Sequence, residues 1–274
     1  MNQTWHDQWA DVDSSGDPDW FIRFLDGSRG GNIAAIKQDP RQFYAYLEVQ
    51  EGQHILDVGS GTGDLTRPLA DLVGPGGRVV GIDYSQTMVE EARRRAAEEG
   101  SQVEFIQGDV RSLPFQASEF DAVQVRLVFQ HLRDPRPALA EVVRVLKPGG
   151  RLAIVEQDWE TMVIDATDRV LTRKVVNMFN DALPNGWIGR QLYGLLKQEG
   201  LEQVVTTGTL VMLPNFEVVS KLLGFDQLFD HLREQSQATD AEIEAWQADL
   251  RQRSQEGRFM VGFTMFTATG HKPL

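Results

Sequence analysis

The sequence predicts an α/β fold, in which a largely parallel sheet is covered by helices on both faces. Short apolar runs alternate with amphipathic segments through the middle of the chain, from residue 53 to residue 156. Turns rich in glycine and proline separate these segments, and 41% hydrophobic with 24% charged residues is the composition of a globular protein. Strands that alternate with helices form βα units, which build parallel sheets.

The expected elements follow one another along this region. Residues 74–77 (GPGG) and 147–150 (KPGG) end the helices before them, because proline cannot continue the backbone hydrogen-bond ladder. Each apolar run has the length of a strand, and each amphipathic segment has the apolar spacing of a helix. The expected strands are 53–58, 78–82, 103–107, 119–125 and 150–156, and the expected helices are 63–73, 85–99 and 135–146.

Strict alternation ends after residue 156. A helical stretch at 165–182, a turn at 184–186, a helix at 187–199 and a strand near 203–213 are expected, followed by two or three amphipathic helices in 215–256 and a closing strand at 258–269. The aromatic-rich start of the chain also looks helical. We therefore expect a helical N-terminal segment over 1–47 and one domain over 48–274, with helical insertions near 157–184 and 214–257.

The charge of the chain excludes one class of partner. The formal net charge is −13, and the basic run at 93–95 lies on a predicted helix, where we expect it to face solvent. Nucleic-acid binding needs a basic surface that displaces counterions from phosphates. Small molecules are therefore the favoured substrate class.

Cysteine content and hydropathy bear on location. The chain has no cysteine, which rules out disulfides and thiolate metal sites. Its first residues lack the charge and apolar stretch of a signal peptide, and no apolar run approaches the roughly 20 residues that span a bilayer. We expect a cytoplasmic protein without a membrane span, as a monomer or a homodimer.

A glycine-rich loop follows the first predicted strand. Gly59, Gly61 and Gly63 stand at alternate positions in ILDVGSGTG (55–63). Glycine lets the backbone approach a ligand closely and adopt positive φ, and the helix that follows points free N–H groups at an anionic group. The loop predicts a site for a nucleotide-like ligand; the alternative is a tight turn without a ligand.

A dinucleotide site is the main rival for this loop. Its fingerprint spaces the glycines as G-x-G-x-x-G, whereas Asp64 occupies the position of the third glycine here. The spacing G-x-G-x-G therefore weakens the NAD interpretation without removing it.

Carboxylates follow the next two predicted strands. Asp83 ends the second, where a carboxylate can accept hydrogen bonds from both ribose hydroxyls. Asp109 follows the third, where it can accept from an adenine amino group while Val110 packs against the ring. Because the carboxyl ends of parallel strands meet at one edge of the sheet, these residues and Asp57 predict a single adenosine site.

These motifs together resemble the class I methyltransferase family, in the small-molecule branch that includes ubiquinone, menaquinone and many natural-product methyltransferases. The resemblance covers residues 50–156 and matches the family in order and spacing; residues 1–47 and 157–274 match only in outline. It rests on ILDVGSGTG (55–63), VVGIDYS (79–85), GDVRSLPF (108–115), FDAVQVRLVFQHL (120–132) and RVLKPGGRLAIVE (144–156).

The resemblance implies a Rossmann-like sheet of seven strands with the last antiparallel, and S-adenosylmethionine (SAM) as the cofactor. By position, Asp57 and the three glycines are implied to contact the methionine part, Asp83 the ribose, Asp109 and Val110 the adenine, with Arg126 lining the methionine side. Residues 214–257 are longer than in many relatives, and we expect them and the N-terminal segment to cap the substrate. The further candidate cofactor contacts are Ser60, Thr62, Tyr84 and Met88.

The methyl group of a sulfonium is already activated, so alignment of the acceptor and exclusion of water supply much of the rate. An oxygen acceptor also needs a general base, and His131 and Glu156 are the candidates, although each also suits a structural role. The histidines are scattered and show no metal-binding spacing, so we expect no metal. A hydrophobic or aromatic acceptor fits the aromatic-rich flanks better than a highly charged one, but the residues do not choose between oxygen, nitrogen and carbon. An NAD-dependent oxidoreductase and a non-catalytic SAM-binding protein remain the alternatives.

Overall fold

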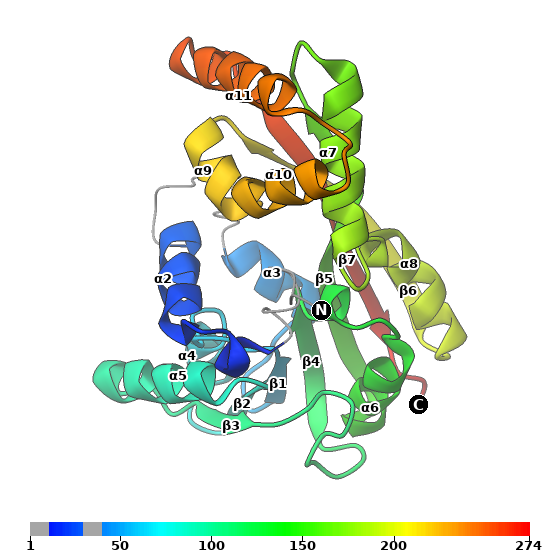
Figure 1. The fold of residues 1–274 in the computed structure, drawn as a ribbon. Coiled ribbons are helices and arrows are strands. Elements are labelled where there is room, and N and C mark those ends of the chain that lie inside the picture. The colour runs from blue at the N-terminus through cyan, green and yellow to red at the C-terminus, as the bar shows by residue number, and fades with distance from the viewer. Residues whose placement is uncertain (1–10, 30–39) are drawn as a thin grey trace.

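A seven-stranded sheet forms the centre of the molecule in a computed structural model that describes residues 11–29 and 40–274 (Figure 1). The strand order is β3-β2-β1-β4-β5-β7-β6. β1 to β5 pair in parallel, while β7 runs antiparallel to both β5 and β6, so the expected antiparallel last strand is confirmed. The strands are β1 (His54–Val58), β2 (Arg78–Asp83), β3 (Glu104–Gln107), β4 (Phe120–Arg126), β5 (Leu146–Ile164), β6 (Glu202–Leu213) and β7 (Val261–His271).

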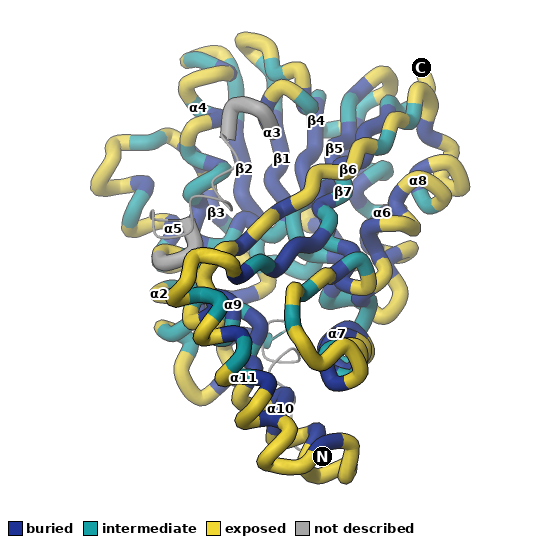
Figure 2. Tube along the Cα trace, turned by 90° about the horizontal axis from the view of Figure 1, so that it is seen from above, coloured by how far each residue is buried: buried dark blue, intermediate teal, exposed yellow. Residues whose placement is uncertain are grey.

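Helices cover both faces of this sheet. On one face, α3 (Pro40–Leu47), α4 (Arg67–Val73) and α5 (Gln86–Glu99) contribute to the core that contains Ile55 and Val79. On the other face, α6 (Arg136–Val145) and α8 (Ile188–Gln198) pack on the side chains of alternate strand residues such as Leu56 and Val80. Figure 2 shows the central strands as dark buried tubes between the helices. The alternation of faces follows from the two-residue period of a strand.

Seven further helices are described, and four of them extend the first face. Their bounds are η1 (Val12–Ser14), α2 (Pro18–Arg29), η2 (Phe129–His131), α7 (Arg169–Ala182), α9 (Phe216–Leu222), α10 (Phe225–Glu234) and α11 (Asp240–Gln255). Side chains of α7, α9, α10 and α11 join the same apolar core as α3 to α5. The expectation of two or three helices in residues 215–256 is met by three.

β5 is longer than the sequence indicates. The expected strand ends at residue 156, but β5 continues to Ile164 beside β7, with a register shift between Asp158 and Val163. Trp159 and Met162 in this extension are buried against α7 and the helices that follow. The first part of the helical insertion expected near 157–184 is therefore strand, and its helix begins at Arg169.

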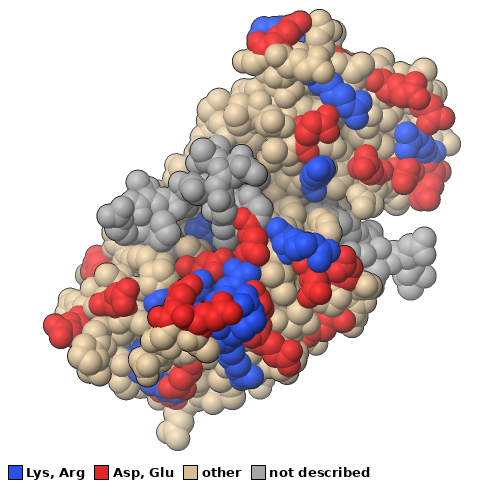
Figure 3. Space-filling model, turned by 90° about the vertical axis from the view of Figure 1, so that its left-hand side faces the viewer, with Lys and Arg blue, Asp and Glu red and all other residues tan. Residues whose placement is uncertain are grey.

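The basic run at 93–95 faces solvent only in part. Arg93 and Arg94 are exposed, but the Arg95 side chain is 16% exposed and forms ion pairs with Asp26 of α2 at 2.8 Å and with Asp64 at 3.3 Å. Figure 3 shows acidic and basic side chains interleaved on this face. Because Arg94 and Arg95 pair with carboxylates and Arg93 donates to the backbone oxygen of Phe105, the run does not form the basic surface that nucleic-acid binding requires.

The described residues contain no helix that is both long enough and apolar enough to cross a membrane.

Candidate active site at the carboxyl edge of the sheet

The glycine loop between β1 and α4 has a backbone that only glycine adopts without strain. Gly59, Gly61 and Gly63 have φ values of 74°, 53° and 78°. A Cβ atom on Gly59 would lie 2.2 Å from Cγ2 of Val128, and one on Gly63 would lie 2.5 Å from Cζ of Phe105. Side chains of β3 and of the turn after β4 thus pack closely against the loop, which leaves its backbone to form the floor of a site.

Polar side chains within and beside the loop are buried. Asp57, in β1, accepts a hydrogen bond from the hydroxyl of Thr66. The Thr62 hydroxyl lies 3.2 Å from Oδ2 of Asp64, to which it donates. The hydroxyl of Ser60 is buried and has no hydrogen-bond partner among the residues that the structure describes. Since a buried polar group without a partner costs free energy, Ser60 is available for a ligand group.

Asp83 lies at the end of β2 and contacts the glycine loop directly. Its Oδ2 accepts a hydrogen bond from the Gly61 backbone N–H at 2.8 Å, and its Oδ1 accepts one from the Ser85 N–H at 3.0 Å. Burial raises the pKa of Asp83; the backbone hydrogen bonds oppose this shift, and the nearby charge of Asp13 adds to it. The carboxylate and the loop therefore form one unit, as the sequence motifs predict.

The N-terminal segment also contacts the glycine loop and the turn after Asp83, and the motifs do not predict these contacts. Asp13 in η1 accepts hydrogen bonds from the Ser85 hydroxyl at 2.7 Å and from the backbone N–H groups of Gln86 at 2.6 Å and Thr87 at 3.1 Å. Cδ1 of Leu25 in α2 lies 3.7 Å from the Cβ position of Gly61. These contacts join residues far apart in the chain, and no local sequence signal marks them.

Two further candidates at this end differ in their surroundings. Met88 is buried in a small cluster with Val12 and Phe21, so its side chain packs against the N-terminal segment. Tyr84 is 52% exposed beside Asp83. Tyr84 is thus accessible to a ligand, whereas Met88 anchors the segment above it.

The third carboxylate, Asp109, lies in the turn after β3 and pairs with Arg111 at 2.6 Å. This hydrogen-bonded pair holds the pKa of Asp109 below its usual value. Val110 is half-buried and packs against the apolar core on the α6 face. At the end of β4, Arg126 is also half-buried. The structure therefore brings Asp57, Asp83, Asp109 and Arg126 to the ends of four strands that are neighbours in the sheet.

Glu156 holds the turn that follows β4. It is fully buried, and its Oε1 accepts hydrogen bonds from the backbone N–H groups of Val128 at 2.8 Å and Phe129 at 2.6 Å. Its other oxygen, Oε2, has no partner among the described residues. Burial raises the pKa of Glu156 to about 8. Such a carboxyl group positions backbone, and its placement does not support the expectation that it acts as a general base.

His131 ends the short helix η2 in the same turn and is half-buried. Burial lowers its pKa to about 4, so the imidazole is neutral near pH 7. A neutral imidazole has one nitrogen that can take up a proton, as a general base must, but the lowered pKa makes His131 a weak base.

The raised pKa of Glu156 predicts a pH dependence of stability. In the folded protein, Glu156 keeps a proton that it releases above its ordinary pKa of 4.5 in the unfolded chain. The contribution of Glu156 to the free energy of unfolding is therefore complete at low pH and is lost as pH rises through about 8. Glu156→Gln retains the acceptor oxygen but does not ionise. The stability of Glu156→Gln relative to the wild type should therefore increase between pH 4.5 and about pH 8, by up to about 1.4 kcal/mol per pH unit.

Urea unfolding of both proteins at several pH values measures this difference, because other titrating groups are common to both. Glu156→Ala is the control for the hydrogen bonds, and we expect it to be destabilised at every pH. A constant difference between wild type and Glu156→Gln would contradict a protonated Glu156.

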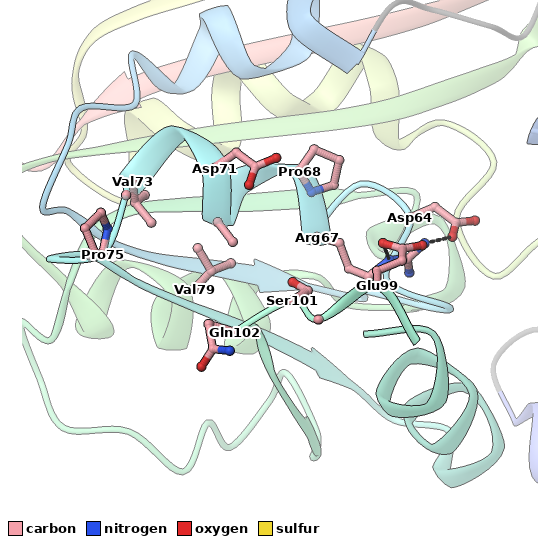
Figure 4. A pocket seen from close by; sticks show the side chains of 14 residues that line it. Asp64, Arg67, Pro68, Asp71, Val73, Pro75, Val79, Glu99, Ser101 and Gln102 are labelled. Carbon is pink, nitrogen blue, oxygen red and sulfur yellow. Dashed lines mark hydrogen bonds and ion pairs between the residues drawn. The ribbon is translucent and has the colours of Figure 1, made fainter. Parts of the chain in front are cut away.

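A separate groove lies outside this edge. It has a volume of about 910 Å³ and lies between α4 and the end of α5 (Figure 4). Arg67 in its wall donates to Asp64, Glu99 and the backbone oxygen of Thr62, so this cation is already paired. None of the candidate site residues lines the groove.

The residues at the sheet edge fit SAM, the cofactor that the motifs imply. The glycine backbone, the buried hydroxyl of Ser60 and the carboxylate of Asp83 offer acceptors and donors for an amino-acid end and a ribose. Within the described ranges, 11–29 and 40–274, no group of three or more His, Asp or Glu side chains is placed to hold a metal.

Comparisons with known proteins agree with this arrangement. A family model described as a methyltransferase domain matches residues 56–154. An uncharacterized 37.1 kDa protein in a transposon of Streptomyces fradiae is 38% identical over 182 residues, which are 66% of this chain and 52% of that protein. The demethylmenaquinone methyltransferase of Lactococcus lactis is 41% identical over 114 residues, which are 41% of this chain and 45% of that protein. The chain thus spans about half the length of these curated relatives.

Solved structures share the fold. The YcgJ protein of Bacillus subtilis superposes with a TM-score of 0.61 at 22% sequence identity, covering 86% of this chain and 98% of that one. These relatives give no support to an NAD-dependent oxidoreductase. Residues 56–154 thus match a methyltransferase domain, and the strand order and the glycine loop agree with that match.

Proposed function

We propose that this chain transfers a methyl group from SAM to a small-molecule acceptor held above the carboxyl edge of the sheet. The observation that carries the proposal is the hydrogen bond from the Gly61 N–H to Asp83 at 2.8 Å, which joins the glycine loop to the ribose-binding carboxylate. SAM supplies an activated methyl group when bound. The residues described above bind and orient the cofactor, and alignment of the acceptor with exclusion of water accelerates the transfer.

The turn after β4 has a positioning role in this proposal. Glu156 fixes the backbone of Val128 and Phe129, and Val128 in turn packs beneath Gly59. The same turn presents His131, the candidate base for an oxygen acceptor. An acceptor that is already nucleophilic, such as an amine, does not require this base.

The cap consists of α2 and α3 together with α9, α10 and α11. Leu25 of α2 already lies beside Gly61, and the other helices pack on the same face of the sheet as α3 (Figure 1). A cap in this place excludes water from the edge where the transfer occurs. The alternative roles for these helices, packing or a dimer surface, use the same contacts.

The aromatic residues do not define the acceptor. Trp159 packs against Phe179 and Phe263, with ring centroids 4.9 and 4.7 Å apart, and Phe225 and Phe229 pack against Trp246. These rings are buried in the apolar core of the first face. They therefore give little support to the expected hydrophobic or aromatic acceptor, and we propose only a small molecule.

Asp13 offers a test of the N-terminal part of the cap. Asp13→Ala removes the three hydrogen bonds to the turn after Asp83. We expect cofactor binding to lose the equivalent of one such bond, about 0.5–1.5 kcal/mol, so SAM affinity should fall about 2- to 12-fold. Asp17→Ala is the matched control, since Asp17 bonds Trp20 and Arg23 within its own segment. Calorimetric titration measures both variants, and equal affinities would contradict a role for η1 at the site.

Methyl transfer itself is tested with SAM that carries a radiolabelled methyl group. The protein is incubated with panels of phenols, amines and compounds with acidic C–H bonds, and label that moves to an acceptor is counted. Asp83→Ala serves as the control for transfer of label that does not depend on the proposed SAM site. SAM binding with no labelled acceptor across the panels would favour the non-catalytic alternative.

The expected location is part of the same proposal. The absence of cysteine suits the reducing cytoplasm, where small-molecule methylation has its cofactor available.

A further inference from the structure

β6 is a long edge strand that is protected only near its start, where its register with β7 shifts between Glu202 and Val205. It pairs with β7 on one side only, and Figure 2 shows it exposed along most of its length. The opposite edge, β3, has only four residues and carries Glu104 in an ion pair with Arg78 at 3.0 Å. β6 has twelve residues. Short length and charge prevent unwanted pairing at natural edges. β6 is not short.

Beyond its first residue, Glu202, the strand also lacks charge. No charged residue occurs between Glu202 and Glu217, although the whole chain has a formal net charge of −13. Leu210 and Met212 on β6 are 59% and 47% exposed, and Val163 on β5 is 51% exposed. We call Val163, Leu210 and Met212 the edge patch.

The edge patch is continuous across three strands. The Cβ position of Gly262 on β7 lies 3.3 Å from Cδ1 of Leu210 and 3.5 Å from Cγ2 of Val163. Gly262 thus lets the side chains of β5 and β6 approach each other over β7. Exposed apolar surface beside an open strand edge marks an interaction site.

We propose that β6 pairs antiparallel with β6 of a second copy of this chain and forms a homodimer with one sheet running through both copies. A two-fold axis places the same patch on both sides, so the backbone edge and the edge patch meet their own equivalents. The chain has a formal net charge of −13, so most of its surface repels another copy. Residues 203–216 carry no charge, so pairing through them brings no like charges together. The same neutrality offers nothing that would attract an acidic or basic peptide.

The first test is the mass of the wild-type protein across micromolar concentrations, measured by light scattering after size exclusion. We expect twice the chain mass, and Leu210→Glu should weaken self-association at least about tenfold because like charges meet at the two-fold interface. Leu72→Glu is the matched control: Leu72 is 45% exposed on α4, and the charge change is the same.

Three results would overturn the proposal: a monomeric wild type, a dimeric Leu210→Glu variant, or equal dissociation of the Leu72→Glu variant. Thermal melts of the variants show that each remains folded. None of these outcomes depends on SAM or on methyl transfer.

The second test uses the absence of cysteine from the chain. Thr207→Cys and Thr209→Cys place one thiol each on exposed positions in the middle of β6, and Leu72→Cys places one on α4. Under mild oxidation, a disulfide between copies should form rapidly in at least one of the β6 variants and not in the control, because only residues near a two-fold axis approach their equivalents. Equal rates in all three variants would contradict pairing through β6.

Discussion

Gly59→Ala is expected to lower the free energy of unfolding by about 2–5 kcal/mol and to abolish measurable SAM binding. A left-handed backbone costs an alanine about 1–2 kcal/mol, and overpacking a filled space costs about 1–3 kcal/mol more. Both apply at Gly59, where φ is 74° and the added Cβ would lie 2.2 Å from Val128. Relief of this overlap moves either the loop or the turn after β4, and the proposed SAM site includes the loop. Urea unfolding and calorimetric titration measure the two effects.

Gly100→Ala separates the two causes. Gly100 ends α5 with φ of 67°, but no atom lies within 4 Å of the Cβ position. It should therefore show the backbone cost alone and leave SAM affinity unchanged. The double variant Gly59→Ala with Val128→Ala should recover part of the lost stability. Equal destabilisation by Gly59→Ala and Gly100→Ala would mean that the contact with Val128 is unimportant.

Asp83→Ala is expected to weaken SAM binding by about 1.5–3 kcal/mol, or about 10- to 150-fold, since hydrogen bonds to a charged group are lost. The carboxylate also accepts from the N–H groups of Gly61 and Ser85, so its removal loosens the glycine loop. Asp83→Asn keeps an acceptor for the backbone and should lose less affinity than Asp83→Ala. Calorimetric titration of the three proteins measures this order. Unchanged affinity in Asp83→Ala would contradict the assignment of Asp83 to the ribose.

The first four strands could be predicted from the sequence because their signals are local. The expected strand at 119–125 lies within one residue of β4, and the glycine loop and Asp83 lie at the strand ends where the motifs place them. Each of these strands is an apolar run bounded by glycine or polar residues, so the pattern and the packing agree.

The extension of β5 could not be predicted in this way. Glu156 and Asp158 interrupt the apolar run, yet both are fully buried. Glu156 bonds the turn after β4, and Asp158 forms an ion pair with Arg190 of α8. Partners of this kind lie about thirty residues away in sequence, so a local pattern treats both carboxylates as strand ends when they are not. The contact of Asp13 with Ser85 was missed for the same reason.

The cofactor is the central claim, and calorimetric titration of the purified protein with SAM, S-adenosylhomocysteine and NAD, each alone, tests it most directly. The glycine spacing and the match of residues 56–154 to a methyltransferase domain predict micromolar binding of SAM and its demethylated product, with no binding of NAD. Binding of NAD without binding of either adenosyl compound would contradict the account and return the glycine loop to the dinucleotide interpretation.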